Sequence, residues 1–329
     1  MISVSHLTKR YGNHTAVSDL SFTIEKGQIY GLLGPNGAGK STTMNIMTGC
    51  LAATSGDVTI GGCDIFEQPR EAKKRIGYLP EQPPLYLDRT PREYLTFVAR
   101  AKRIPAQDRE RQIASVMAVT GIPDVADRLI KNLSKGYRQR VGIAQAILGD
   151  PEVVILDEPT VGLDPRQIIE IRELIRSLGE RHTVILSSHI LSEVRAVCQT
   201  ILIISKGKLV ACDTPANLER LFAPTLSVAL TLEVREDQQE LLTEMLAVLP
   251  ENVGTQLEPQ AGDRVRLTVE TASQDETNLC RQLFFACSRA ELPILQMTTS
   301  RASLEDVFLE LTASEGAGEA APAGEEASA

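Results

Sequence analysis

The chain has 329 residues, enough for one domain of about 200 residues and a smaller second one. Its net charge of −9 argues against a nucleic-acid partner, because such a partner requires a basic surface. The scattered cysteines form no CxxC pair, so we expect free thiols in a reducing cytosol. No apolar run reaches the roughly 18 residues of a membrane span, so we expect no direct membrane insertion.

Short β-branched runs alternate with helical patterns over most of the first 220 or so residues. The runs lie at 2–5, 16–24, 28–33, 57–60, 153–157, 183–187, 200–205 and 208–212. This alternation predicts an α/β fold with a mainly parallel central sheet. Between about residues 90 and 150 helical patterns replace the strands. Thr90, Pro91 and Glu93 have the pattern of an N-cap, a first helical position and a capping box, so we expect a helical subdomain there.

The character of the sequence changes again after residue 221. We expect a strand, a helix, two strands, a helix and a strand at 226–234, 236–248, 252–257, 263–270, 274–289 and 293–298. That order predicts a small α+β domain of ferredoxin-like type over 222–312, with a last helix near 303–312. Residues 314–329 consist of Gly, Ala, Glu, Pro and Ser, so we expect 313–329 to be a disordered acidic tail.

A phosphate-binding loop (P-loop) reads GPNGAGKS over residues 34–41. It matches G-x-x-x-x-G-K-[ST] and lies between the apolar run 29–33 and a predicted helix over 40–48. Glycines let backbone N–H groups approach phosphates, and the helix start adds positive dipole. We expect Lys40 to reach the β- and γ-phosphates and Ser41 to ligate Mg²⁺. The predicted nucleotide contacts in this loop are Gly34, Asn36, Gly37, Gly39, Lys40, Ser41 and Thr42.

A second acidic element follows the apolar run 153–156, which ends in Asp157 and Glu158. The run predicts a buried strand with both carboxylates at its exposed end. Asp157 is expected to hold Mg²⁺, directly or through water, and Glu158 to polarise an attacking water. Such pairs also occur as solvated loop starts, but a phosphate-binding loop requires an acidic partner of this kind.

Residues 133–140 read LSKGYRQR and resemble the LSGGQ signature of ABC ATPases. Leu133, Ser134 and Gly136 fit that signature, whereas Lys135 and Tyr137 depart from it. Ser134 is a suitable N-cap and Gly136 leaves backbone N–H groups open at a helix start, which suits a γ-phosphate. Lys135 adds positive charge at the same place.

Further segments resemble elements of the same family. The stretch 162–165 resembles its D-loop, with Asp164 as an N-cap; His189 is similar to its switch histidine, and Tyr11 to its adenine-stacking aromatic residue. The glutamine of its Q-loop aligns with Glu81, with Gln82 adjacent, and either residue is a candidate to sense Mg²⁺. One sequence leaves that choice open.

Taken in order, these elements cover about residues 1–220 and resemble ABC transporter ATP-binding subunits. The stretches YLPEQPPLY, LSKGYRQR and SLEDVFLEL resemble the branch that powers ABC-2-type permeases, which are mostly exporters. The resemblance implies a P-loop NTPase cassette over 1–221, with a RecA-like core, the helical subdomain and the small C-terminal domain. It also implies the ligands ATP and Mg²⁺, with Lys40, Glu158 and His189 as catalytic residues.

The resemblance further implies a homodimer or heterodimer that encloses two ATP molecules, each between the P-loop of one subunit and Ser134–Gly136 of the other. Asp164 is a further predicted nucleotide contact. A separate transmembrane permease would bind near residues 81–94 and hold the subunit at the cytoplasmic face of the membrane. One alternative is a non-transport ABC ATPase with a soluble partner, but the usual second cassette or coiled-coil insertion is missing. The other is a regulatory module without turnover, against which the set Lys40, Asp157, Glu158 and His189 argues.

Overall fold

The computed structural model describes residues 1–222, 226–235, 238, 241–243, 245, 253–271 and 275–301. The chain divides into two compact units, with the boundary between Pro215 and Ala216. The sequence places the boundary between residues 221 and 222, later than this division and at the end of helix α8 (Pro215–Phe222). No helix among the described residues is long and apolar enough to span a bilayer.

The first unit contains a parallel sheet with strand order β10-β9-β3-β8-β7-β6. Its strands are β3 (Ile29–Leu33), β6 (Ile76–Leu79), β7 (Val153–Leu156), β8 (Thr183–Ser188), β9 (Thr200–Ser205) and β10 (Lys208–Asp213). All neighbours pair in parallel except β10, which runs antiparallel to β9. The predicted central sheet is confirmed, and β6 is an additional strand in it.

The earliest β-branched runs belong to a different sheet, which the sequence pattern does not predict. It has the order β2-β1-β4-β5 and is antiparallel throughout. Its strands are β1 (Ile2–Tyr11), β2 (His14–Ile24), β4 (Ser55–Ile60) and β5 (Cys63–Asp64). Burial alternates along β2, as in a sheet that covers the core with one face, whereas β3, β7 and β8 are buried on both faces.

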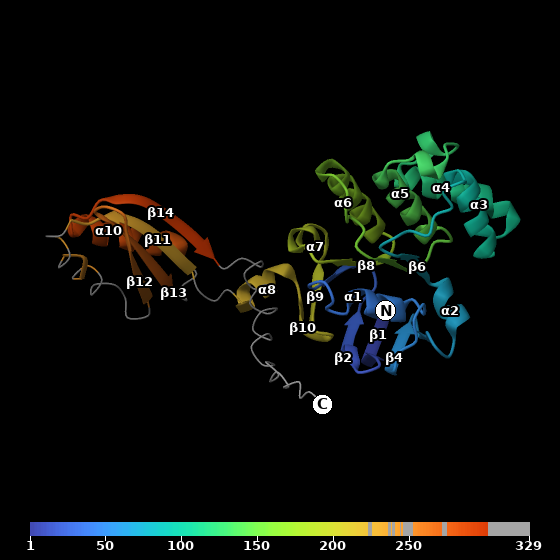
Figure 1. The fold of residues 1–329 in the computed structure, drawn as a ribbon, viewed down its shortest axis with the longest axis horizontal. Helices are drawn as coiled ribbons and strands as arrows, with labels where there is room; N and C mark the ends of the chain where they lie inside the picture. The colour runs from blue at the N-terminus through green and yellow to red at the C-terminus, as the bar shows by residue number, and fades with distance from the viewer. Residues whose placement is uncertain are drawn as a thin grey trace, which may run out of the picture. The chain divides into compact units, whose positions relative to one another are not determined.

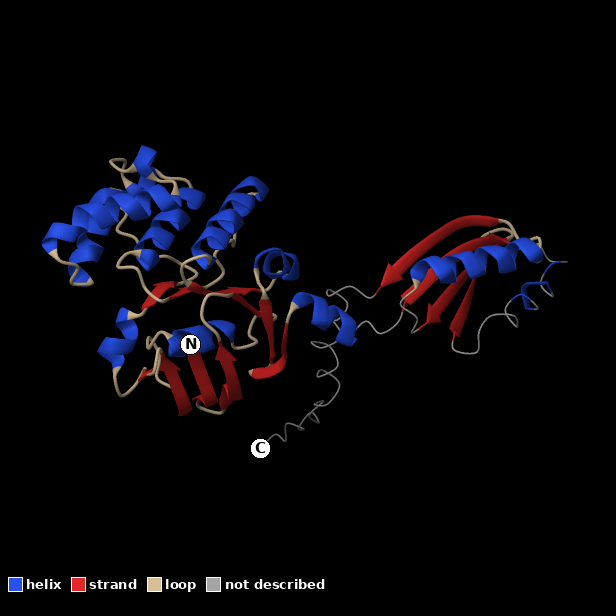
Figure 2. Ribbon diagram, turned by 180° about the vertical axis from the view of Figure 1, so that it is seen from behind, coloured by secondary structure: helices blue, strands red, loops and turns tan. Residues whose placement is uncertain are grey.

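One apolar core fills the space between the two sheets. It joins Ile2 and Leu20 of the antiparallel sheet, Met44 of α1 (Lys40–Met47), and Ile155 and Ile185 of the parallel sheet. Helix α1 therefore lies between the sheets (Figure 2). The phosphate-binding loop, which directly precedes α1, is held between two packed layers.

The other face of the parallel sheet carries further helices of this unit (Figure 1). They are α3 (Pro91–Ala101), α4 (Ala106–Thr120), α5 (Lys135–Ile147), α6 (Pro165–Gly179) and α7 (Leu191–Val197), with the short α2 (Pro69–Lys74) beside β6. Helices α3, α4 and α5 lie where the sequence predicts a helical subdomain. The capping box at the start of α3 is confirmed, because Thr90 Oγ1 accepts from the Glu93 N–H and Glu93 Oε2 accepts from the Thr90 N–H.

The second unit has an antiparallel sheet with the order β12-β13-β11-β14. Its elements are β11 (Leu226–Glu233), β12 (Val253–Gln260), β13 (Arg264–Thr271), α10 (Glu276–Arg289) and β14 (Ile294–Arg301). Leu279, Leu283 and Cys287 of α10 are buried in its apolar core. These elements follow the predicted order. The predicted helix 236–248 lies largely outside the described residues, and the helix near 303–312 and the tail 313–329 lie wholly outside them.

Candidate active site

The loop between β3 and α1 has a backbone conformation that favours glycine at two positions. Gly37 and Gly39 have φ values of 81° and 101° in the left-handed region. A Cβ atom on Gly39 would lie 2.5 Å from the carbonyl oxygen of Ala16. Helix α1 then begins at Lys40, as predicted. The fold thus presents the helix start and the preceding N–H groups to one pocket, which is the arrangement that binds phosphate.

Lys40 is folded back over this loop. Its side chain is only 6% exposed, and its ammonium group donates to the carbonyl oxygens of Gly34 at 2.8 Å and Pro35 at 3.2 Å. The same nitrogen lies 3.6 Å from Glu158 Oε1. A buried ammonium requires such partners because burial without them is costly. Lys40 is therefore a charged donor fixed at the phosphate-binding loop.

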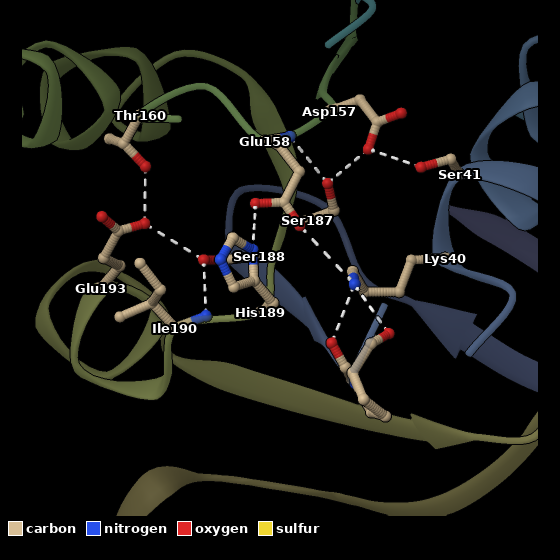
Figure 3. A network of polar contacts seen from close by, with 12 residues as sticks. Lys40, Ser41, Asp157, Glu158, Thr160, Ser187, Ser188, His189, Ile190 and Glu193 are labelled. Carbon is tan, nitrogen blue, oxygen red and sulfur yellow. Dashed lines mark hydrogen bonds and ion pairs between the residues drawn. The ribbon is translucent and has the colours of Figure 1, made fainter. Parts of the chain in front are cut away.

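The carboxylates at the end of β7 are buried and connected to this loop. Asp157 and Glu158 are 3% and 7% exposed. Ser41 Oγ donates to Asp157 Oδ1 at 3.3 Å, and Ser187 Oγ donates to the same oxygen at 2.5 Å. Ser187 Oγ also accepts from the Glu158 N–H at 2.8 Å, so it holds both acidic residues (Figure 3). Ser187 was not among the predicted site residues, since a serine inside the run 183–187 gives no local sign of this contact.

Glu158 lies between a cation and an imidazole. Its Oε1 faces Lys40, and its Oε2 lies 3.0 Å from His189 Nδ1 (Figure 3). The backbone of Glu158 has φ 47°, a left-handed conformation that costs a non-glycine residue about 1–3 kcal/mol. The surrounding contacts hold the residue in this conformation, which points its carboxylate into the site.

Lys40, Ser41, Glu158 and His189 line a pocket of about 540 Å³, whereas Asp157 and Gly34 are not among its lining residues. Its lining residues are Tyr11, His14, Ala16, Asn36, Gly37, Ala38, Gly39, Lys40, Ser41, Thr42, Glu81, Glu158, Val161 and His189. Tyr11 is about half exposed, with the Lys9 ammonium 5.1 Å from its ring centroid. Of the two Q-loop candidates, Glu81 lines the pocket and Gln82 does not. His14, Ala16 and Val161 are lining residues that the sequence analysis did not single out.

The signature residues form part of a different pocket, of about 380 Å³, together with Asp164. Ser134 Oγ accepts from the Tyr137 N–H at 3.3 Å, and Asp164 Oδ1 accepts from the Gln167 N–H at 2.9 Å. Both predicted N-caps are therefore confirmed. Ser134, Gly136 and Asp164 are absent from the lining of the P-loop pocket. Within one chain, the predicted nucleotide-binding residues thus fall into two separate groups, one at the P-loop pocket and one at the signature pocket.

The comparisons with known proteins agree with this arrangement. Residues 17–161 match the family model described as ABC transporter. The chain is 32% identical over 314 residues to the linearmycin resistance ATP-binding protein of Bacillus subtilis, an alignment that covers 95% of this chain and 98% of that protein. This chain belongs to the family of ABC transporter ATP-binding proteins. The predicted family and the cassette fold are confirmed, and the chain is an ATP-binding, ATP-hydrolysing subunit.

Other relatives of this ABC protein extend the likeness. It is 33% identical over 320 residues to the Nod factor export ATP-binding protein I of Ralstonia nicotianae, covering 96% of this chain and 94% of that one. It is 41% identical over 211 residues to the bacitracin transport ATP-binding protein of Bacillus licheniformis, covering 64% and 68%. A solved ATP-binding subunit of an ABC transporter superposes with a TM-score of 0.61 at 29% identity, over 68% of this chain and 93% of that one.

Proposed function

We propose that this subunit binds Mg²⁺-ATP between the P-loop of one copy and the signature of another, and that hydrolysis drives export through a separate transmembrane permease. The observation that carries the proposal is the contact network that joins Lys40, Ser41, Asp157, Glu158 and His189, all of which except Asp157 line one pocket (Figure 3). These side chains come from elements far apart in the chain.

The nucleotide would lie along the P-loop pocket. Its phosphates would take the N–H groups of the loop, and Lys40 would exchange the carbonyls of Gly34 and Pro35 for phosphate oxygens. The adenine would stack on Tyr11, whose ring is exposed at the pocket edge. Asn36 and Thr42 line the same pocket and would contact the phosphates.

The residues around Ser41 suit Mg²⁺. The Ser41 hydroxyl and an Asp157 carboxylate oxygen are in direct contact at 3.3 Å, and Mg²⁺ prefers oxygen ligands supplied by one or two carboxylates together with substrate phosphates. When bound there, the ion would neutralise charge that develops on the phosphates. We assign Glu81, which lines the pocket, as the Q-loop residue, with Gln82 as the alternative.

Glu158 is the proposed general base or water-positioning group. Water adds to the γ-phosphorus while the bond to the ADP oxygen breaks, and the carboxylate of Glu158 orients the water and accepts its proton. His189 contacts that carboxylate at 3.0 Å, so it would hold Glu158 and contact the γ-phosphate. Lys40 would stabilise the charge on the transferred group.

The second pocket supports a dimeric site. Ser134 and Asp164 are exposed, and Lys40 is not among the residues that line this second pocket. In a homodimer or heterodimer, Ser134 and the backbone of Gly136 would face the γ-phosphate of the ATP bound to the other subunit, with Asp164 beside them. Each ATP would then be enclosed only when two subunits meet.

An exposed apolar patch supports a permease contact near residues 81–94. Tyr86, Leu87 and Phe97 are 48%, 49% and 50% exposed, and the rings of Tyr86 and Phe97 lie 5.3 Å apart. Patches of this kind are typical of protein interaction sites. Because the relatives are named for export of Nod factors, transport of bacitracin and resistance to linearmycin, we propose an exported substrate and a position at the cytoplasmic face of the membrane.

Affinity capture of the tagged subunit from detergent-solubilised native membranes tests this function. We expect a multi-span permease in fixed stoichiometry, together with Mg²⁺-dependent phosphate release by the purified complex. Variants with Tyr86→Ser and Phe97→Ser are expected to lose the permease and keep the ATPase activity of the isolated subunit. Recovery of only soluble partners would favour the non-transport alternative, and absence of phosphate release would contradict the catalytic assignment.

A further inference from the structure

Glu193 is a buried carboxylate near the active site that has no role in the mechanism above. It lies on α7 and is 6% exposed. No lysine, arginine or histidine in the described part of the chain forms an ion pair with it. A carboxylate buried in this way must be satisfied by hydrogen bonds, and its partners indicate what it holds.

The partners of Glu193 belong to the two segments that carry Glu158 and His189. Its Oε2 accepts from the hydroxyl of Thr160 at 2.5 Å and from the hydroxyl of Ser188 at 3.1 Å. Thr160 follows Glu158 by two positions, and Ser188 directly precedes His189. One carboxylate oxygen therefore connects the segment after β7 with the end of β8 (Figure 3).

The same contacts extend into the turn after β8. Ser188 Oγ accepts from the Ile190 N–H at 3.0 Å while it donates to Glu193. His189 lies between Ser188 and Ile190 in the sequence, so the contact between these two residues holds its backbone on both sides. Its imidazole then reaches Glu158 at 3.0 Å.

Helix α7, which carries Glu193, is seated closely on the P-loop strand. A Cβ atom on Gly31 of β3 would lie 2.0 Å from Val194 Cγ1 and 2.9 Å from Cys198 Sγ. Val194 is fully buried. Glycine in a strand interior allows this close approach, so α7 has a fixed place relative to the strand that leads into the P-loop.

We propose that Glu193 is a positioning residue for ATP hydrolysis, which keeps the Glu158 and His189 segments in register with the P-loop strand without touching nucleotide. This inference rests on the proposed roles of Glu158 and His189. Positioning is needed because Glu158 has the left-handed backbone described above, and nothing local to its sequence favours that conformation. A displacement of about 1 Å between such groups can lower a rate about 100-fold.

Steady-state ATP hydrolysis by the full-length chain, with and without its permease, tests the proposal. Glu193→Ala is expected to lower kcat about 10- to 100-fold, while KM for ATP changes less than about twofold. Glu193→Gln is expected to retain most activity, because its amide oxygen still accepts from both hydroxyls. Ser192→Ala, an exposed position on the same helix, is the matched control and should leave kcat unchanged.

A double-mutant cycle separates positioning from a general structural role. If Glu193 acts through His189, Glu193→Ala should have little further effect on single-turnover phosphate release in a His189→Ala background. An equal loss in both backgrounds, or wild-type kcat in Glu193→Ala, would overturn the proposal. If Glu193→Ala does not fold, Thr160→Val replaces it in the experiment, with the same expected loss of kcat and unchanged KM.

The proposed catalytic site is tested separately. Wild-type turnover by Glu158→Gln would refute that site, independently of the result for Glu193.

Discussion

The P-loop pocket and the signature pocket are held together in different ways. Around the P-loop, Lys40, Asp157 and Glu158 are buried. Lys40 lies beside Glu158, and Asp157 accepts from the hydroxyls of Ser41 and Ser187, so these contacts join distant segments of the chain. Around the signature, Ser134 and Asp164 are exposed, and each bonds to the backbone of its own helix start.

This difference follows from burial. A buried charge must find its partners within the chain, so the P-loop pocket is organised before nucleotide arrives and carries backbone strain at Glu158. The exposed polar groups of the signature are in contact with water, and they can exchange that water for the phosphate of an ATP molecule bound to the other subunit. The first pocket is therefore suited to binding and chemistry in one chain, and the second to completing a site in another.

The largest expected effect comes from the carboxylate of the first pocket. Glu158→Gln removes the proton acceptor and is expected to lower the rate of phosphate release about 10²- to 10⁴-fold. ATP binding should persist, because Lys40 and the loop N–H groups remain, and the bound state should accumulate as a dimer. Phosphate release, nucleotide binding and gel filtration with ATP measure the three quantities. Glu180→Gln, at an exposed position, is the control.

Lys40→Ala removes the buried ammonium and should weaken ATP binding. A charge-assisted hydrogen bond contributes about 1.5–3 kcal/mol, so Kd is expected to rise about 10- to 100-fold. Titration calorimetry measures Kd directly. Lys26→Ala, which removes an exposed ion pair with Glu152, should leave Kd unchanged. Equal ATP affinity of the Lys40→Ala and wild-type proteins would contradict the proposed role of Lys40 in phosphate binding.

Gly136→Asp tests whether the signature pocket acts in dimerisation and not in ATP binding by the monomer. A Cβ atom at this position would lie 2.7 Å from the side chain of Gln167, and the added carboxylate would repel a phosphate. We expect ATP binding by the monomer to change less than about twofold, whereas ATP-dependent dimerisation in the Glu158→Gln background is lost. Gly136→Ala adds the Cβ without the charge and should retain part of the dimer. Normal dimerisation of the aspartate variant would argue against the signature contact.

The smallest expected effect concerns the cap at Ser134. Ser134→Ala removes the acceptor for the Tyr137 N–H and should lower the free energy of unfolding by about 1 kcal/mol. Ser134→Thr keeps a capping hydroxyl and should stay near the wild type. Denaturant unfolding followed by circular dichroism measures the difference. A change in monomeric ATP affinity in the alanine variant would contradict the separation of the two pockets.

Those features of the site that depend on neighbours in the sequence were predictable. The P-loop, the acidic pair after β7, and the helix starts at Thr90, Ser134 and Asp164 each lie within a few residues, so turn and cap chemistry determines them. The parallel sheet followed from its apolar runs for the same reason. The residue pattern within one short run does not indicate which sheet the strand joins. The separate antiparallel sheet was therefore not predicted.

Only the tertiary structure decided which distant side chains meet. Ser187 reaches Asp157 because β7 and β8 are parallel neighbours whose carboxyl ends share one edge of the sheet. Glu193 reaches Thr160 and Ser188 because α7 packs closely against the glycine of β3. These contacts depend on long-range packing, and a buried serine or glutamate within an apolar pattern carries no local mark of its partner.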